Sequence, residues 1–216
     1  MKGDRLLIHP EHTARAADIV EQLADVLQDR AVITVAGESG AGKSELGTEI
    51  ALALNTRDIP AAVIQQDDYF VFPPKTNHEM RRRNLEQVGL YEVKLGLLDG
   101  NLRSFKRGDN PIYKPVVDYD ADSIAYVEVD FSDHRVLVVE GTYTTTLEFA
   151  DWRVFIDRTF EQTRAHREAR GRDSLEPFVE SVLRTEHEII ASHRPLADFV
   201  VASDFQSVAR QRTSAS

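Results

Sequence analysis

Apolar and polar positions alternate with two different periods along this chain. Apolar residues at Ala17, Val20, Leu23 and Leu27 recur at helical spacing, which predicts a helix over residues 11–28. Residues 31–36 (AVITVA) form a short β-branched run that ends at a glycine, as a buried strand does. A strand of this kind after an amphipathic helix indicates a protein built from helices and strands in turn.

The rest of the chain continues this alternation and predicts an α/β fold, with a parallel sheet flanked by helices. Residues 109–130 contain prolines and an alternating segment, and we expect a hairpin there. Residues 1–205 are expected to form a single domain, and the polar residues 206–216 a flexible tail. Further helices are predicted at 43–54, 84–105, 159–170 and 175–191, and further strands at 61–65, 135–139, 153–156 and 199–202.

Composition narrows the possible functions. The net charge of −10 argues against a broad basic surface for nucleic acid. The chain has no cysteine, which excludes disulfides, thiolate zinc sites and thiol nucleophiles, and its histidines lack metal-ligand spacing. No segment is apolar for long enough to span a membrane or act as a signal peptide. We therefore expect a cytoplasmic enzyme that binds neither nucleic acid nor membrane.

The clearest motif is GESGAGKS, a complete G-x-x-x-x-G-K-S between the predicted strand and helix. Its glycines let backbone amides surround phosphate groups, and the helix N-terminus adds partial positive charge. Lys43 can reach the β and γ phosphates, and the Ser44 hydroxyl can bind Mg²⁺. The motif predicts a P-loop, and the candidate nucleotide-binding residues are Gly37, Glu38, Ser39, Gly40, Ala41, Gly42, Lys43 and Ser44.

Acidic residues follow two other predicted strands. Glu140 ends the apolar run 136–139, and Asp67 and Asp68 come just after the strand at 61–65. Carboxyl ends of parallel strands line the ligand crevice, so these acids should face the nucleotide. Glu140 could hold Mg²⁺, and an aspartate could assist the metal or take a proton from a hydroxyl. The spacing alone leaves open which aspartate acts.

Two arginine-rich segments could bind anions. The segment 164–172 could form a lid that closes on the triphosphate, or a solvated helix face that pairs with Glu161 and Glu168. The run Arg81–Arg83 could bind an anionic substrate or cover a solvated turn, and it slightly favours an anionic acceptor. The four arginines of the candidate lid are Arg164, Arg167, Arg170 and Arg172.

In combination, residues 31–205 resemble the uridine kinase and phosphoribulokinase group of P-loop kinases. QQDDYF resembles the segment that carries that group's catalytic base, which gives Asp67 this role, and KPVVDY resembles its substrate hairpin. VVEG matches the metal-associated acid at Glu140, and the arginine stretch that ends in GRD matches the lid. The substrate-binding residues that the resemblance implies are Asp68, Tyr69, Arg83, Glu86, Lys114, Asp118, Tyr119 and Arg172.

The chain departs from this group where the group binds its nucleoside. Val117 stands where an aromatic residue is expected, the histidine after it is absent, and Glu86-Gln87-Val88 replaces an H-P-D stretch. The resemblance therefore supports the reaction class of this group more strongly than its specificity for uridine.

We therefore expect ATP-dependent transfer of a phosphoryl group to a hydroxyl of a small molecule, with Mg²⁺. A pyrimidine nucleoside is the first candidate acceptor; a pantothenate-like compound, a sugar phosphate, or an ATPase or nucleotide-binding module without an acceptor are alternatives. The chain has no N-K-x-D motif of the kind that reads guanine in GTPases. The resemblance also implies a homo-oligomer. Predicted catalytic residues are Lys43, Asp67, Arg167 and Arg170, with Arg164 at the nucleotide and Ser44, Asp67 and Glu140 at the metal.

Overall fold

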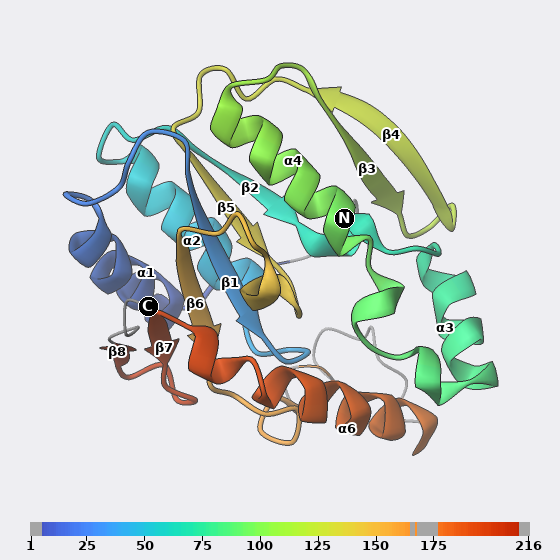
Figure 1. Ribbon diagram of the computed structural model, residues 1–216. Helices are drawn as coiled ribbons and strands as arrows, with labels where there is room; N and C mark the ends of the chain where they lie inside the picture. The colour runs from blue at the N-terminus through green and yellow to red at the C-terminus, as the bar shows by residue number, and fades with distance from the viewer. Residues whose placement is uncertain (1–5, 165–166, 168–176, 212–216) are drawn as a thin grey trace.

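The computed structural model describes residues 6–164, 167 and 177–211. Within these residues, a six-stranded sheet in the order β2-β5-β1-β6-β7-β8 forms the centre of the molecule (Figure 1). Adjacent strands pair in parallel except β7 and β8, which are antiparallel. The strands are β1 (Ala31–Gly37), β2 (Ala61–Gln65), β5 (Val136–Glu140), β6 (Trp152–Ile156), β7 (Phe199–Val201) and β8 (Val208–Arg210).

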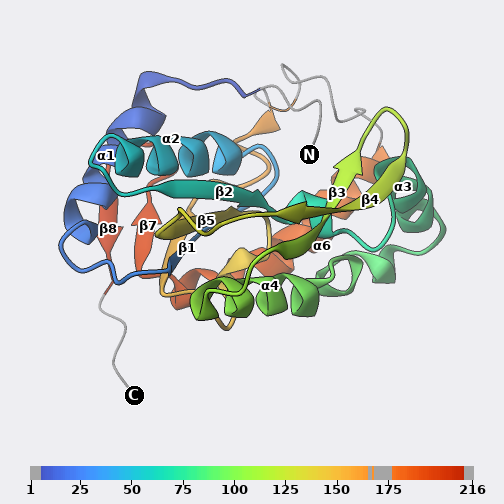
Figure 2. The same cartoon turned by 90° about the horizontal axis from the view of Figure 1, so that it is seen from above.

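Helices cover both faces of the sheet. Figure 2 shows α1 (Pro10–Leu23) and α2 (Lys43–Asn55) on one face, and α4 (Leu95–Arg107) and α6 (Pro177–Ala191) on the other. Every residue of β1 is buried, and its side chains alternate between two apolar cores. Ile33 and Val35 pack with α1 and α2, whereas Val32 and Ala36 pack on the side of α4. The predicted fold class, a mainly parallel sheet flanked by helices, is confirmed.

The predicted hairpin is also present. Strands β3 (Ile112–Asp118) and β4 (Ser123–Val129) pair antiparallel, from Ile112 opposite Val129 to Asp118 opposite Ser123. They form a second, two-stranded sheet beside α4, beyond the β2 edge of the central sheet (Figures 1 and 2). The hairpin thus extends outward from the region where the phosphate-binding motif and the acids are expected to meet.

The segment between β2 and α4 differs from its prediction. A single helix over 84–105 is wrong, because the backbone is extended at Asn84 and Gly89 has a φ of 136°. The chain instead forms η1 (Gln66–Tyr69), an unpredicted helix α3 (Pro74–Arg83), the short turns η2 (Leu85–Gln87) and η3 (Leu90–Glu92), and only then α4. Both Asn84 and Gly89 interrupt helical geometry, so the leucine spacing carries a helix only from residue 95 onward.

Two end regions also differ in extent. Helix α1 ends at Leu23, earlier than the predicted residue 28. The segment from Gln206 was expected to fray, yet Val208–Arg210 pairs with β7 as strand β8. Residues 168–176, which include Arg170 and Arg172 of the predicted lid, lie outside the described residues.

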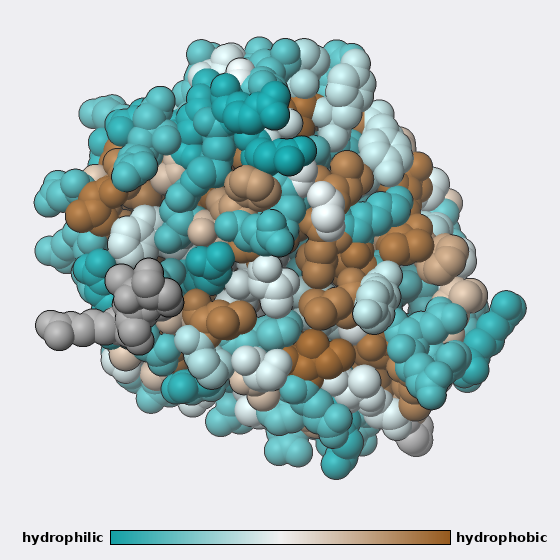
Figure 3. Space-filling view, viewed as in Figure 1, coloured by the Kyte–Doolittle hydropathy of each residue, from teal (hydrophilic) through white to brown (hydrophobic). Residues whose placement is uncertain are grey.

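Large apolar residues are exposed in several parts of the described surface. On the face in Figure 3, apolar residues gather between α4 and α6, amid polar surroundings. The connection from η1 to α4 exposes large apolar side chains at Val71, Phe72, Leu85, Leu90 and Tyr91. Over the described ranges, every helix is too short or too polar to cross a bilayer.

Candidate active site

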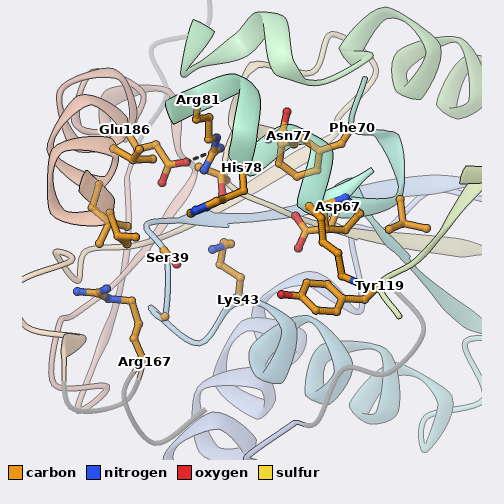
Figure 4. Close-up of a pocket in the computed structure, with 18 of the residues that line it drawn as sticks. Ser39, Lys43, Asp67, Phe70, Asn77, His78, Arg81, Tyr119, Arg167 and Glu186 are labelled. Atoms are coloured by element: carbon orange, nitrogen blue, oxygen red, sulfur yellow. Dashed lines mark hydrogen bonds and ion pairs between the residues drawn. The ribbon is translucent and has the colours of Figure 1, made fainter. Parts of the chain in front are cut away.

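A cavity of about 650 Å³ opens at the carboxyl ends of β1, β2 and β5. Its walls come from the motif after β1, from η1 and α3, from the hairpin and from α6 (Figure 4). This is the edge at which parallel α/β sheets bind ligands, and the volume suits a small-molecule site. The predicted phosphate-binding and acidic residues therefore meet in one place.

The motif after β1 has the conformation of a phosphate-binding loop. Gly40 and Gly42 adopt φ angles of 72° and 98°, which L side chains rarely reach. A Cβ on Gly40 would lie 2.5 Å from Cγ of Arg167, so a side chain cannot be added there without displacing that arginine. Helix α2 begins at Lys43, and its N-terminus faces the loop. Lys43 Nζ donates to the Glu38 carbonyl oxygen at 2.9 Å.

Glu38 has a role that the motif alone did not reveal. Its buried carboxylate accepts a hydrogen bond from the Phe160 backbone N–H at 2.6 Å, and its other oxygen lies 2.7 Å from His187 Nδ1. The side chain therefore joins the loop to the start of the segment after β6 and to α6. Among the predicted nucleotide-binding residues, Glu38 contributes its backbone to the loop and uses its side chain to fix the loop's position.

Ser44 and Glu140 lie together beneath the loop. Ser44 Oγ donates to Glu140 Oε1 at 3.1 Å, and both line the cavity. Burial, reinforced by the negative charge of Asp67, raises the pKa of Glu140 to about 7, against the opposing effects of Lys43 and of the Ser44 hydrogen bond. A hydroxyl and two nearby carboxylates form an oxygen-only donor set of the kind that Mg²⁺ prefers.

The two adjacent aspartates after β2 point to different partners. Asp67 is half-buried and lines the cavity, where Figure 4 shows it on the side of Tyr119. Asp68 is buried outside the lining and binds the hairpin, accepting from Lys114 Nζ at 2.8 Å and from the Val117 backbone N–H at 3.0 Å. Of the two aspartates, Asp67 is the one that lines the cavity.

The substrate residues implied by resemblance separate into two groups. Tyr119 lines the cavity. Tyr69 is fully buried and its hydroxyl accepts from Asn101 on α4 at 2.9 Å, so it belongs to the core. Others occupy places away from the described lining: Asp68 and Lys114 hold the hairpin, Asp118 Oδ1 accepts from Ala121 N–H in its turn, and Arg83 and Glu86 are exposed.

Of the four candidate lid arginines, the structure describes Arg164 and Arg167. Arg167 lines the cavity, and its guanidinium donates to the Phe160 carbonyl oxygen at 3.1 Å and to Thr163 Oγ1 at 3.3 Å. Arg164 is exposed and is not part of the described lining. Arg167 therefore has a position beside Gly40 from which it can approach a bound phosphate.

A charged cluster on the wall opposite the phosphate-binding loop was not predicted from the sequence. Arg81 donates from Nη2 to Glu92 Oε1 at 3.1 Å and to Glu186 Oε1 at 2.9 Å, and its Nε also binds Glu92. Asn77 Nδ2 donates to Glu92 Oε2 at 2.9 Å. Burial lowers the pKa of Arg81, but the two carboxylates raise it by more, so its pKa lies above the usual value. Arg81 was only one of three consecutive arginines, and nothing in the spacing distinguished it.

The chain is similar to kinases in sequence and in structure. Residues 32–195 match the Phosphoribulokinase / Uridine kinase family. The bifunctional alpha-galactosidase/sucrose kinase of Mediterraneibacter gnavus is 28% identical over 82% of this chain, which spans only 20% of that longer protein. The uridine kinase of Ureaplasma parvum is 28% identical over 70% of this chain and 74% of its own length.

Solved structures show the same fold. The phosphoribulokinase of Rhodobacter spheroides superposes with a TM-score of 0.59 at 15% identity, over 80% of this chain and 69% of its own. The match over residues 32–195 covers the loop, both acidic strand ends, the hairpin and all of α6. The chain therefore belongs to the phosphoribulokinase / uridine kinase family of ATP-dependent kinases.

Proposed function

We propose that this protein transfers the γ-phosphoryl group of ATP to a hydroxyl group of a small molecule, with Asp67 as the base. The observation that carries the proposal is the placement of Asp67 in the same cavity as Lys43, Ser44 and Glu140. A protein that only binds nucleotide has no need of a carboxylate at that position. Family membership supports phosphotransfer to a small molecule, and the residue roles below are inferred from geometry.

The nucleotide end of the cavity fits a triphosphate. The loop 37–42 turns at glycines with positive φ, where a Cβ would meet neighbouring side chains such as Arg167, and the N-terminus of α2 provides backbone donors. Lys43, which donates to its own loop at 2.9 Å, would turn to the β and γ phosphates, and Arg167 would approach from the side of Gly40. Both cations would stabilise negative charge on the transferred group.

Ser44, Glu140 and Asp67 fit a magnesium ion by the chemistry of their oxygen donors. A bound Mg²⁺ would neutralise part of the negative charge of the phosphates. Glu140 gives up its proton when it binds a cation, since it must be ionised to do so. The Ser44 Oγ lies 3.1 Å from Glu140 Oε1, so both groups would hold the same ion.

Asp67 would act on the acceptor. Its carboxylate is half-buried just after the carboxyl end of β2, beside Tyr119 and away from the phosphate-binding loop (Figure 4). From there it can accept the proton of a hydroxyl and hold the oxygen in line with the γ-phosphate. Phe70, Val117 and Phe178 provide apolar lining nearby, as pockets for small organic molecules usually have.

Two kinds of acceptor merit the first trials. Relatives of this chain are named for uridine and for sucrose, which share several neutral hydroxyl groups. We propose such hydroxylated compounds as acceptors, ahead of pantothenate-like ones. Val117, buried in the lining, is a smaller side chain than the aromatic residue expected in a nucleoside kinase, and this favours sugars over pyrimidine nucleosides.

The test is ADP release from Mg·ATP in the presence of uridine, cytidine, fructose, sucrose, pantothenate and sugar phosphates. We expect release that depends on the acceptor, and Asp67→Asn should lower kcat by at least about 100-fold while ATP affinity stays nearly unchanged. Release that is independent of every acceptor would identify an ATPase instead. Full turnover by Asp67→Asn would show that another residue is the base.

A further inference from the structure

The wall of the cavity opposite the phosphate-binding loop is built around one arginine and two carboxylates. Arg81 on α3 binds Glu92, the last residue of η3, and Glu186 on α6, at the distances given above. The side chains of Glu92 and Glu186 are 4% and 11% exposed, so this cluster is largely out of water. Arg81 and Glu186 both line the cavity, and Figure 4 shows them in contact above Lys43.

The Nε and Nη2 groups of Arg81 are both bonded to carboxylates. One guanidinium faces two carboxylates, which leaves the cluster with an excess negative charge when all three are ionised. Arg81 was part of a run that suggested an anionic acceptor, but an incoming carboxylate or phosphate would meet Glu92 and Glu186 beside it, and their negative charge opposes its own. Burial raises the pKa of Glu186 against the opposing charge of Arg81, and when this carboxylate is ionised the wall is net negative and repels an anion.

The neighbouring basic residues do not change this balance. Arg82 packs over the Phe178 ring at 5.7 Å, and Arg83 is exposed outside the described lining. Lys75 lines the cavity but donates to the Asp120 carbonyl oxygen at 3.0 Å, at the tip of the hairpin. Glu79, on the same helix as Lys75, also lines the cavity and offsets the charge of that lysine. Lys43 and Arg167 stand at the phosphate end, where the nucleotide would occupy them.

Glu186 also has hydrogen-bonding capacity left over. In the described part of the chain, Arg81 contacts it through Oε1, and Glu186 is part of the cavity lining. A carboxylate oxygen accepts hydrogen bonds from hydroxyl groups and has none to donate when ionised. The wall thus suits a partner that brings hydroxyl donors and no negative charge.

We propose that Glu186 selects the acceptor: it accepts a hydrogen bond from a hydroxyl of an uncharged polyol and excludes acceptors that carry phosphate or carboxylate. This rests on the proposed phosphotransfer at the same site and narrows its acceptor to uncharged polyhydroxyl compounds. It reverses the preference for an anion that the arginine run alone suggested. Glu186 lies in none of the motifs that indicated the kinase, and only the fold brings it to the cavity.

The experiment compares matched acceptors that differ in one charged group: fructose against fructose 6-phosphate, and glycerol against glycerate. Binding is measured by calorimetry with Mg·ADP present, and kcat/KM by ADP release. The wild type should bind and phosphorylate the uncharged member of each pair, and the anionic member at least about tenfold less well. Glu186→Gln should lower affinity for the uncharged acceptor about tenfold and reduce the discrimination against the anion.

Two variants control for indirect effects. Glu188→Gln makes the same change of charge two residues along α6 on an exposed side chain, and it should leave both affinities unchanged. Glu186→Asp keeps the negative charge but shortens its reach, so it should still exclude anions while binding the uncharged acceptor more weakly. Thermal melting and ATP affinity show whether each variant folds. If Glu186→Gln does not fold, Glu186→Asp is used for the test instead.

The outcomes separate the two proposals. Binding of fructose or glycerol without phosphorylation would refute the kinase assignment at this site and support the role of Glu186. Acceptor-dependent turnover that prefers the anionic compounds, or discrimination that Glu186→Gln leaves unchanged, would overturn the role of Glu186 while the kinase stands. Failure of the wild type to bind any uncharged compound in the set would also overturn it.

Discussion

Asp68 anchors the β3–β4 hairpin to the end of β2 through Lys114. The carboxylate accepts from Lys114 Nζ at 2.8 Å and from the Val117 backbone N–H at 3.0 Å. The side chain of Asp68 is 7% exposed and that of Lys114 is 11% exposed. Because Asp67 precedes Asp68 directly, the position of the hairpin and that of the proposed base are fixed by neighbouring residues. Tyr119 and Val117 reach the cavity from this same hairpin.

Asp68→Asn should therefore weaken acceptor binding through the hairpin. The change leaves Lys114 buried beside a neutral amide, and we expect it to lower the free energy of unfolding by about 3 kcal/mol. In the folded variant, KM for the acceptor should rise more than KM for ATP, whereas Asp67→Asn should act mainly on kcat.

Steady-state kinetics and urea unfolding test this pair of changes. The exposed Asp120 in the hairpin turn provides a control, since its side chain holds no strand in place and Asp120→Asn should change neither quantity. Equal effects of Asp68→Asn and Asp67→Asn on kcat would show that both aspartates act on the substrate.

Gly40→Ala should impair nucleotide binding. The residue has a φ of 72°, and its added Cβ would meet Cγ of Arg167 at 2.5 Å, so the loop or the arginine must move. We expect ATP affinity to fall by at least about tenfold, because backbone strain of about 1 kcal/mol adds to the lost position of Arg167.

Gly100→Ala is the matched substitution. Gly100 lies in α4, where nothing would come within 4 Å of a new Cβ, and alanine should stabilise the helix by up to about 1 kcal/mol. Calorimetric titration with ATP measures both variants. Unchanged affinity in Gly40→Ala would mean that the loop tolerates a side chain at its turn.

Glu140→Gln should separate stability from activity through pH. In the metal-free protein the pKa of Glu140 is raised from 4.5 to about 7, so between these values the folded state binds more protons than the unfolded state. Stability contributed by this group is therefore present below pH 4.5 and is lost as pH rises through 7. Glutamine does not titrate, so the melting temperature of Glu140→Gln should exceed that of the wild type at pH 8, and the difference should shrink toward pH 5.

The same variant should lose function. Without the carboxylate, the Mg²⁺ concentration for half-maximal activity should rise about 10- to 100-fold. Thermal melts with a chelator at several pH values, together with a magnesium titration of activity, provide both measurements. A melting difference that is constant with pH would show that Glu140 has an ordinary pKa.

His187→Ala should weaken nucleotide binding without touching the nucleotide. It removes the 2.7 Å contact to Glu38, which places the loop, and we expect KM for ATP to rise severalfold with a smaller change in kcat. His187→Gln can still donate to Glu38 and should restore part of the affinity. Glu188→Ala on the exposed side of α6 should have no effect, and an equal effect of all three changes would point to a general loss of helix stability.

The parts of the site that could be predicted are those encoded within a few residues. The loop 37–44 and the acids after β2 and β5 depend on a strand, its end and the next turn, and local periodicity reveals all three. Contacts between distant segments could not be foreseen: Arg81 and Glu186 are 105 residues apart, and Lys114 and Asp68 are 46 apart. The arginine run 81–83 looked uniform, but the rotation of α3 gives each arginine a different surrounding.

The leucines near residue 95 misled for a related reason. Spacing of three and four marked a helix correctly over α4, but extending it back to Asn84 ignored Gly89, whose φ of 136° ends helical geometry. The missed turns contain Glu92, the residue that holds Arg81 and Asn77. Because the segment 84–92 was predicted as helix, the prediction missed Glu92 as a part of the site.

Glu186 and His187 are consecutive residues of α6, yet they hold opposite walls of the cavity: one binds Arg81 and the other binds Glu38. A ligand that shifts α6 at either wall disturbs the contact at the other. Thermodynamic linkage then makes the effect mutual, so any factor by which the nucleotide changes affinity for the acceptor must equal the factor by which the acceptor changes affinity for the nucleotide. The ternary complex has the same free energy whichever substrate binds first. Any preferred order of binding must therefore come from the rates of binding and release.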